Sequence, residues 1–294
     1  MGILFILIAA IFWGIIGLFT RPLLDMGFTP IQLSAARALV GAVCAVVYCL
    51  VKNPKLLKIR FTDLWIFIGT GLVSFTFMNI FYYMTQKLCS LSTAAVLLYT
   101  SPIFVMIMSA LFFKEKITYP KVVALVLAAA GCVLVSGIGA SDFTLTGFLT
   151  GIGSGLAYAL YSIFSHMGLK RYHSVTITAY TFIVAVVVTI PICRPVNASA
   201  LIARNPGSLL LMLGLGTIAA FIPFLCYTKG METVDTSKAA IIVTLEPVVA
   251  SLLGIFVFKE TLSLTGIAGI LLVLGAVFTL NIEGRFPCQK KRRS

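Results

Sequence analysis

The sequence predicts an all-α integral membrane protein: ten transmembrane helices form two inverted five-helix repeats around a central cavity, with both termini cytoplasmic. Composition, an internal duplication and the placement of basic residues carry this prediction. Hydrophobic residues make up 60% of the 294 residues and charged residues only 11%, and the mean hydropathy is +1.08. A soluble protein cannot bury that much apolar surface, so lipid must be the solvent for most of the chain.

One long apolar stretch occurs twice. Residues 237–260 read SKAAIIVTLEPVVASLLGIFVFKE, and residues 92–115, at an offset of 145 positions, read STAAVLLYTSPIFVMIMSALFFKE. Both stretches have membrane length, contain a proline near the middle and end in a Lys-Glu pair. The same offset matches four further pairs: Phe19 with Phe164, Gly69 with Gly214, Gly71 with Gly216, and Tyr82 with Tyr227. We therefore predict a tandem duplication of a half of about 145 residues.

Ten apolar stretches are long enough to cross a membrane, which takes about 20 residues each. They cover roughly residues 3–20, 31–51, 64–86, 92–113, 120–138, 147–168, 175–193, 208–228, 237–258 and 262–281. Each half thus holds five helices, and because five is odd the second half enters the membrane from the opposite side. The predicted units are a first repeat at 1–140, a second repeat at 146–282 and a basic cytoplasmic tail at 283–294.

The basic residues set the predicted orientation. With both termini in the cytoplasm, the cytoplasmic loops and tail hold most of the 22 Lys and Arg residues, and the outer loops keep Arg21, Lys87, Arg194, Arg204 and Lys259. This asymmetry follows the positive-inside rule. The net charge of +13 is therefore explained by basic residues at the membrane surface. We expect a multi-pass protein of the plasma (inner) membrane and no nucleic-acid partner. The sequence does not decide whether the protein is a monomer or a homodimer.

With these motifs the chain resembles the EamA-type branch of the drug/metabolite transporter (DMT) superfamily over nearly its whole length. The resemblance rests on AAIFWGIIGLFTRPLL at 9–24, PIQLSAARALVGA at 30–42, and the two proline-containing helices that end in Lys-Glu. It implies a ten-helix bundle with a cavity between the repeats, which moves small polar metabolites, commonly amino acids or related compounds, often outward. Ser101 stands where the second repeat has Glu246, so the two halves need not bind a solute identically.

A transporter needs polar side chains inside the membrane, and here they recur at helical spacing. Asn79, Tyr83 and Gln86 share one face of a predicted helix. The predicted substrate-binding residues are Trp13, Asn79, Tyr82, Tyr83, Tyr99, Ser101, Tyr158, Ser162, Tyr227 and Glu246. Tyr99 and Tyr158 lie too deep for an aromatic belt at the membrane surface, whereas such a belt is an equal alternative for the other three tyrosines.

Two charged residues fall inside predicted helices. Glu246 lies about nine residues into its helix, where an unpaired carboxylate is costly. It is a candidate to carry a proton or to bind a substrate ammonium group, and a structural carboxylate is the alternative. Arg37 lies about seven residues into its helix, and its long side chain favours snorkelling to the outer headgroups over a role in the cavity.

Two further patterns concern the packing of the helices. Pro102 and Pro247 occupy equivalent places in the two halves and are candidate hinges for alternating access, although rigid kinks explain them equally well. Gly147, Gly151 and Gly155 recur every four residues, a spacing that lets helix backbones approach closely in lipid. We expect tight packing against a neighbouring helix at these glycines.

A secondary transporter or exporter is the leading interpretation. Its partners would be a small-molecule solute, the lipid bilayer and, where transport is coupled, a proton. An integral membrane enzyme would need paired carboxylates, a histidine-rich metal set or an activated nucleophile. The sequence has no such cluster and no ATP-binding P-loop, so we expect no catalytic residue, no cofactor and no metal. A non-transporting membrane scaffold is the third class, and the deep Tyr, Ser and Glu positions argue against it.

Overall fold

The computed structural model describes residues 1–89, 91–136, 144–259 and 263–283. All regular elements in this part of the chain are helices, which confirms the predicted all-α class. Among the described residues, eight helical stretches are long and apolar enough to cross a membrane: Gly2–Asp25, Pro30–Lys52, Phe61–Leu88, Thr93–Phe113, Leu145–Leu169, Ser174–Ile192, Ser208–Gly230 and Thr236–Phe256. Tyr119–Val135 and Leu264–Leu280 are shorter apolar helices. The ten-span topology stays a prediction.

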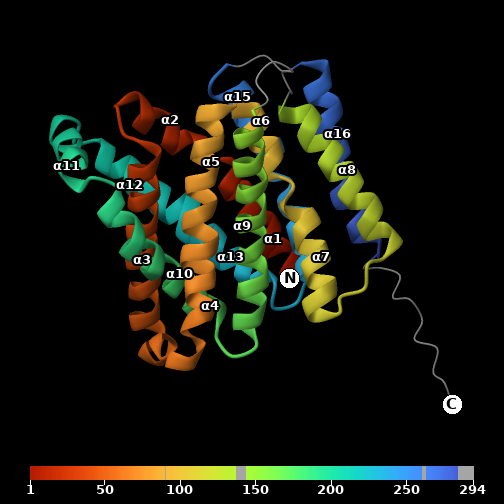
Figure 1. Cartoon of the computed structure of the whole chain (residues 1–294), viewed down its shortest axis with the longest axis horizontal. Coiled ribbons are helices and arrows are strands. Elements are labelled where there is room, and N and C mark those ends of the chain that lie inside the picture. Colours follow the sequence, from red (N-terminus) through yellow and green to blue (C-terminus); the bar gives the residue numbers. More distant parts are fainter. Residues whose placement is uncertain (90, 137–143, 260–262, 284–294) are drawn as a thin grey trace.

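We call the elements before residue 137 the first half and those from residue 145 the second half (Figure 1). The first half consists of α1 (Gly2–Gly14), α2 (Gly17–Asp25), α3 (Pro30–Lys52), η1 (Pro54–Leu57), η2 (Phe61–Asp63), α4 (Leu64–Ile68), η3 (Gly69–Thr76), α5 (Phe77–Leu88), α6 (Leu91–Leu98), α7 (Ser101–Phe113) and α8 (Tyr119–Ser136). The second half consists of α9 (Leu145–Leu169), α10 (Ser174–Ile192), α11 (Pro195–Arg204), α12 (Ser208–Gly216), η4 (Thr217–Phe221), α13 (Ile222–Gly230), α14 (Thr236–Val243), α15 (Glu246–Phe256) and α16 (Leu264–Glu283).

Both proline-containing stretches are split into two helices. Pro102 and Pro247 lie in the first turns of α7 and α15, where a residue without an N–H group breaks no helical hydrogen bond. The helix before each proline therefore ends there, and a new one begins. The Lys residues of the two Lys-Glu pairs, Lys114 and Lys259, both have positive φ angles, of 56° and 58°. Glu260 lies outside the described residues.

Each half also contains a π-helical segment, η3 in the first and η4 in the second. A π-helix leaves carbonyl groups that side chains can satisfy. The Thr76 hydroxyl donates to the Gly71 carbonyl at 2.8 Å, and the Thr217 hydroxyl donates to the Leu213 carbonyl at 2.6 Å. The Ala219 carbonyl of η4 instead accepts a hydrogen bond from another helix, as described below.

The predicted small-residue face of α9 is confirmed by its contacts. A Cβ atom at Gly155 would lie 2.5 Å from the Thr100 Oγ1 atom and 2.8 Å from the Leu97 carbonyl oxygen, so only glycine permits this approach to the chain at α6. A second close pair lies at the side of the bundle, where α8 packs along α16. These tight contacts hold the bundle together without a hydrophobic driving force between helices.

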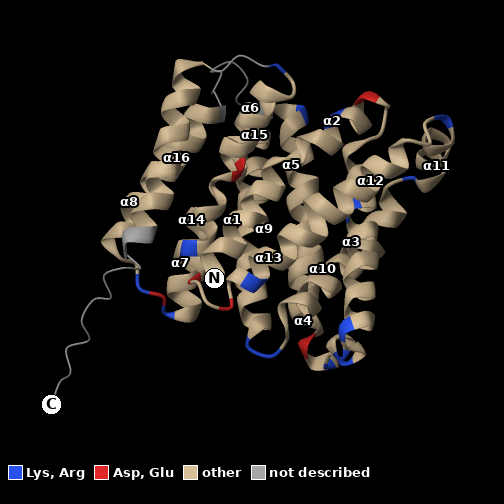
Figure 2. Ribbon diagram, turned by 180° about the vertical axis from the view of Figure 1, so that it is seen from behind, with Lys and Arg blue, Asp and Glu red and all other residues tan. Residues whose placement is uncertain are grey.

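The charged residues of the described chain gather near the two ends of the bundle, and its middle is largely free of charge (Figure 2). This distribution is what a lipid environment demands, because a charge costs least at the membrane surface. We refer to the end that holds α2 as the α2 end. The opposite end, which holds the start of α14 and the end of α7, is the α14 end (Figure 2).

Candidate solute cavity

A cavity of about 330 Å³ lies between helices of both halves. Its walls are formed by Trp13, Ile16, Gly17, Thr20, Arg21, Leu24, Pro30, Leu33, Arg37, Met78, Asn79, Tyr82, Tyr83, Gln86, Leu98, Tyr99, Tyr158, Phe224 and Glu246. Arg21 and Leu24, near the end of α2, are exposed. Gln86 lies two residues before the end of α5. The cavity therefore opens at the α2 end and reaches inward to Phe224 and Glu246.

Seven of the ten predicted substrate-binding residues line this cavity: Trp13, Asn79, Tyr82, Tyr83, Tyr99, Tyr158 and Glu246. The other three do not. Ser101 is buried at the start of α7. The Ser162 and Tyr227 hydroxyls lie 2.8 Å apart in a hydrogen bond, and the Tyr227 ring packs against Trp13 with centroids 5.5 Å apart. Ser162 and Tyr227 thus support the wall from behind.

Arg37 is a cavity residue that the sequence interpretation missed. Its side chain is only 9% exposed, so the predicted snorkelling to the headgroups is wrong. The Nη2 group donates to the Ala219 carbonyl of η4 at 2.9 Å, and the guanidinium lies 5.7 Å and 5.6 Å from the ring centroids of Phe75 and Phe224. Its Nε atom is buried without a hydrogen-bond partner. The guanidinium is therefore held in place, but not all of its N–H donors have a hydrogen-bond partner.

A helical spacing could have placed Arg37 correctly. Ser34 lies one turn earlier on α3, and its hydroxyl is 3.0 Å from the Tyr83 hydroxyl, which is itself a predicted cavity residue. Residues three apart share a helix face, so Ser34 and Arg37 must point to the same side. The position of the partner carbonyl could not be predicted, because it depends on the π-helical geometry of η4.

Glu246 is the first residue of α15 and lies on the cavity wall. Its carboxylate forms no hydrogen bond or ion pair with any residue in the described part of the chain, Arg37 included. A position in the first turn is favourable for an anion, because this end of the helix dipole is positive. Arg37 and Glu246 thus form no direct ion pair, although both charges face the same cavity.

Aromatic rings close the inner side of the cavity. The Phe224 ring packs against Trp13, Phe182 and Tyr161, with centroids 5.2, 5.2 and 4.9 Å apart. Tyr161 is 1% exposed and its hydroxyl lies 2.8 Å from the Thr228 hydroxyl. Such edge-to-face clusters bury large apolar areas and are rigid. We call Trp13, Tyr161, Phe182, Phe224 and Tyr227 the aromatic floor, which separates the cavity from the α14 end.

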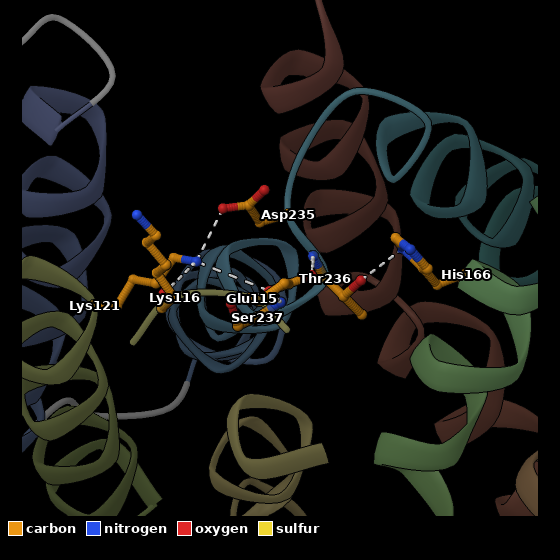
Figure 3. A network of polar contacts seen from close by, with 7 residues as sticks. All are labelled: Glu115, Lys116, Lys121, His166, Asp235, Thr236 and Ser237. Atoms are coloured by element: carbon orange, nitrogen blue, oxygen red, sulfur yellow. Dashed lines mark hydrogen bonds and ion pairs between the residues drawn. The ribbon is translucent and has the colours of Figure 1, made fainter. Parts of the chain in front are cut away.

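A polar cluster joins the two halves at the α14 end (Figure 3). Glu115, just after α7, accepts hydrogen bonds from the backbone N–H groups of Thr236 (2.8 Å) and Ser237 (3.2 Å) and from the Ser237 hydroxyl (2.6 Å). These two donors belong to the first turn of α14. A carboxylate of the first half thus caps a helix of the second half.

Lys121 and His166 extend this cluster to both sides (Figure 3). The Lys121 Nζ atom lies 2.9 Å from the Asp235 carboxylate and 3.8 Å from that of Glu115. The His166 Nδ1 atom lies 2.9 Å from the Thr236 hydroxyl, and its ring stacks on Phe113 with centroids 4.1 Å apart. We call Glu115, Lys121, His166, Asp235, Thr236 and Ser237 the Glu115 cluster. In the part of the chain that the structure describes, no group of three or more His, Cys, Asp or Glu could hold a metal ion.

A helical membrane protein with a cavity that both halves line has the architecture of a membrane transporter. Comparison with known proteins assigns the chain to a family of transporters. The chain belongs to the EamA-like transporter family, whose model matches residues 1–137 and again residues 145–282. This confirms the predicted family and the assignment as a multi-pass membrane protein.

Several relatives share nearly the whole length of this chain. An uncharacterized transporter of Archaeoglobus fulgidus is 29% identical, over 91% of this chain and 94% of its own. The uncharacterized transporter YwfM of Bacillus subtilis is 25% identical, over 96% and 94%. The uncharacterized inner membrane transporter YicL of Salmonella typhimurium is 23% identical, over 97% and 96%. A solved crystal structure has the same fold, with a TM-score of 0.78 at 20% identity and 97% of each chain covered.

Proposed function

We propose that the protein is a secondary transporter that moves amino acids or related zwitterionic metabolites by alternating access, in the export direction. One observation carries this proposal: Arg37 and Glu246 face the same cavity and neither is paired with the other. Opposite charges in a low-dielectric site are costly when they are left unpaired. A solute with a carboxylate and an ammonium group would compensate both at once.

The chemistry of each wall supports this assignment. The Arg37 guanidinium has free donors for a carboxylate, the group that its planar fork matches best. Glu246 would accept from the ammonium group. Tyr82, Tyr99 and Tyr158 line the same cavity, so their rings can cover the apolar part of the solute and attract its cation. Seven of the predicted residues therefore keep their proposed role in binding, and Arg37 joins them.

The repeat architecture is part of the same proposal. The repeats at 1–140 and 146–282 would have inverted topology in the membrane, with both termini cytoplasmic. Support comes from features that recur in both halves: a π-helical segment, a helix broken before a proline, and a left-handed lysine at the end of that helix. The basic tail at 283–294 lies outside the described residues except for its first residue.

Movement would centre on the broken helices. Pro102 and Pro247 each follow a turn that separates two shorter helices, so these turns are the proposed hinges. Glu246 lies at one of them and is the proposed proton site where transport is coupled. A protonated Glu246 would release an ammonium group that the ionised carboxylate binds.

Flux in proteoliposomes tests the function directly. The purified protein is reconstituted into liposomes that are loaded with radiolabelled amino acids, and efflux is followed with and without an imposed pH gradient. The matched solutes are an amino acid with a large apolar side chain, the corresponding amine and the corresponding carboxylic acid. We expect the zwitterion to be transported at least about tenfold faster than either singly charged analogue, because a hydrogen bond to a charged group contributes about 1.5–3 kcal/mol.

Three variants locate the site. Arg37→Gln and Glu246→Gln should each abolish the preference for the zwitterion, and Glu246→Gln should also remove any dependence on the pH gradient. Arg204→Gln removes an exposed charge at the end of α11 that does not line the cavity, and should behave as wild type. Equal transport of the amine and the amino acid, or wild-type selectivity in Arg37→Gln, would exclude this binding mode. A membrane enzyme or a scaffold would give no flux at all.

A further inference from the structure

We propose that the Glu115 cluster is a latch that holds the α14 end of the transporter closed, and that Asp235 takes over the capping of α14 when the latch opens. This inference rests on the proposed alternating-access function, but it does not depend on which solute is carried. It assigns to Glu115, Lys121 and Asp235 a role in the conformational cycle.

The position of the cluster is the first argument. The cavity is open at the α2 end and ends inward at the aromatic floor. Beyond the floor, α13 continues from Tyr227 to Gly230, and the chain then turns into α14 at Asp235. Glu115 meets the start of α14 at this point (Figure 3). The latch therefore bridges the two halves on the closed side of the cavity.

The way in which α14 is capped is the second argument. Asp235 is the residue before α14 and is a residue type that normally caps a helix with its own carboxylate. Its side chain makes no capping hydrogen bond here, because it pairs with Lys121 of α8 at 2.9 Å. Glu115 supplies the cap instead, with three hydrogen bonds from α14 to its two carboxylate oxygens. The first turn of α14 is thus held from the other half of the protein.

This arrangement has a second state built into it. When α7 and α14 separate, the N–H groups of Thr236 and Ser237 lose Glu115, and Asp235 can rotate back to accept from them. The number of satisfied donors in α14 is then nearly the same in both states, which keeps the two states close in free energy. A residue that cannot cap at this position, such as alanine, would leave those donors without a partner from the chain on opening.

Burial of the central contacts makes the latch open as a unit. The side chains of Lys121 and Glu115 are 4% and 12% exposed, whereas that of Asp235 is 59% exposed. The contacts of Glu115 with Lys121 and with the start of α14 are therefore shielded from water while the latch is closed. Phe113 and His166 stack beside it, and Lys170 lies 5.3 Å from the Phe113 ring centroid. Separation of the halves would hydrate all of these groups together, so the latch should open as a unit.

The accessibility of each end of the bundle can be measured separately in nanodiscs, from the labelling rate of a single cysteine introduced at that end. In a background with the seven native cysteines replaced, Ala240→Cys reports on the α14 end, because Ala240 is buried on α14 in contact with the α7 and α9 residues Val105 and Ala159. Gln86→Cys reports on the mouth of the cavity. Opening of the α14 end should raise the labelling rate at the first reporter and lower it at the second.

Glu115→Gln is expected to raise the labelling rate of Ala240→Cys about tenfold and to lower that of Gln86→Cys, since it weakens charged hydrogen bonds. Ser237→Ala, which removes one hydroxyl donor, should give a smaller change in the same directions. Asp235→Ala should slow labelling of Ala240→Cys in the Glu115→Gln background, because it removes the cap of the open state. Glu232→Gln is the matched control, since it removes an exposed carboxylate that pairs with Lys229 within the same half.

The outcomes are distinguishable. Unchanged labelling in Glu115→Gln overturns the latch, and so does a rise at both reporters, which indicates a loosened fold. An equal effect in Glu232→Gln also overturns it. Because no solute is needed, a reciprocal change without flux of amino acids would support the latch and reject the proposed solute class. Normal flux with no reciprocal change would do the reverse.

Discussion

The pair formed by α8 and α16 offers a sharp test of how this bundle is held together. Their backbones approach closely at two glycines, Gly131 and Gly269. A Cβ atom at Gly131 would lie 2.8 Å from the Gly269 carbonyl oxygen and 2.6 Å from the Val273 Cγ2 atom. A Cβ atom at Gly269 would lie 2.7 Å from the Gly131 carbonyl oxygen. Backbone atoms cannot rotate away, so an alanine at either position must separate the helices.

The required separation sets the magnitude of the effect. Ordinary contacts begin near 3.4 Å, so the two helices must part by roughly half an ångström, enough to forfeit about a quarter of the dispersion energy along the interface. Overpacking of this kind typically costs about 1–3 kcal/mol. Alanine also gains about 0.5–1 kcal/mol over glycine through helix propensity, so the net loss of stability in Gly131→Ala should be about 1–2 kcal/mol.

Gly275 on α16 provides the matched control, because a Cβ atom there would meet nothing within 4 Å. Gly275→Ala should therefore show only the propensity gain, and the two variants should differ by about 1–3 kcal/mol in the free energy of unfolding. Chemical unfolding in mixed micelles, followed by circular dichroism, measures this difference. Neither helix contributes a described residue to the cavity wall, so solute selectivity should be unchanged. Equal stability of Gly131→Ala and Gly275→Ala would refute the reasoning.

Three further outcomes can be checked with simple variants. Thr29→Ala removes the capping box at the start of α3, in which Thr29 and Gln32 each accept from the other's backbone, and should lower the free energy of unfolding by about 1 kcal/mol. Lys114→Gly should be about 1 kcal/mol more stable than Lys114→Ala in the same measurement, because both remove the charge and only glycine adopts the left-handed backbone without strain. Cys49 and Cys132, 0% and 1% exposed, should resist alkylation in the native protein and react after denaturation, as mass spectrometry would detect.

Much of the fold could be predicted from the sequence because its signals are local. The apolar stretches have membrane length, and their ends agree with those of the helices to within a few residues. The breaks at Pro102 and Pro247 follow from proline chemistry. The short helix α11 lies in a connection and carries no apolar run of membrane length, so it was missed. The π-helical segments have no sequence signature that distinguishes them from α-helix.

The candidate site was predicted less completely, for a different reason. Tyr99 and Tyr158 could be placed in the cavity from depth alone, because polar tips far from the headgroups need a polar space. The role of Arg37 depends on a carbonyl 182 positions later in the chain, and that of Glu115 on helix donors about 120 positions later. Such partners are fixed by the way in which the two halves pack, which periodicity within one helix does not reveal.

The π-helical segment η3 has a consequence for how the cavity wall is encoded. An extra residue in one turn rotates everything after it by about 100° relative to a continuous α-helix. Asn79, Tyr82 and Tyr83 all follow η3 in the same span, so their direction depends on η3 remaining a π-helix. A change that turned η3 into regular α-helix at unchanged length would keep all three side chains, yet rotate them by about a third of a revolution, away from the solute and toward other helices or lipid. Deletion of one residue in the same change would bring them back to the cavity, so the length of η3 and its π-helical form must match for this wall to face the solute.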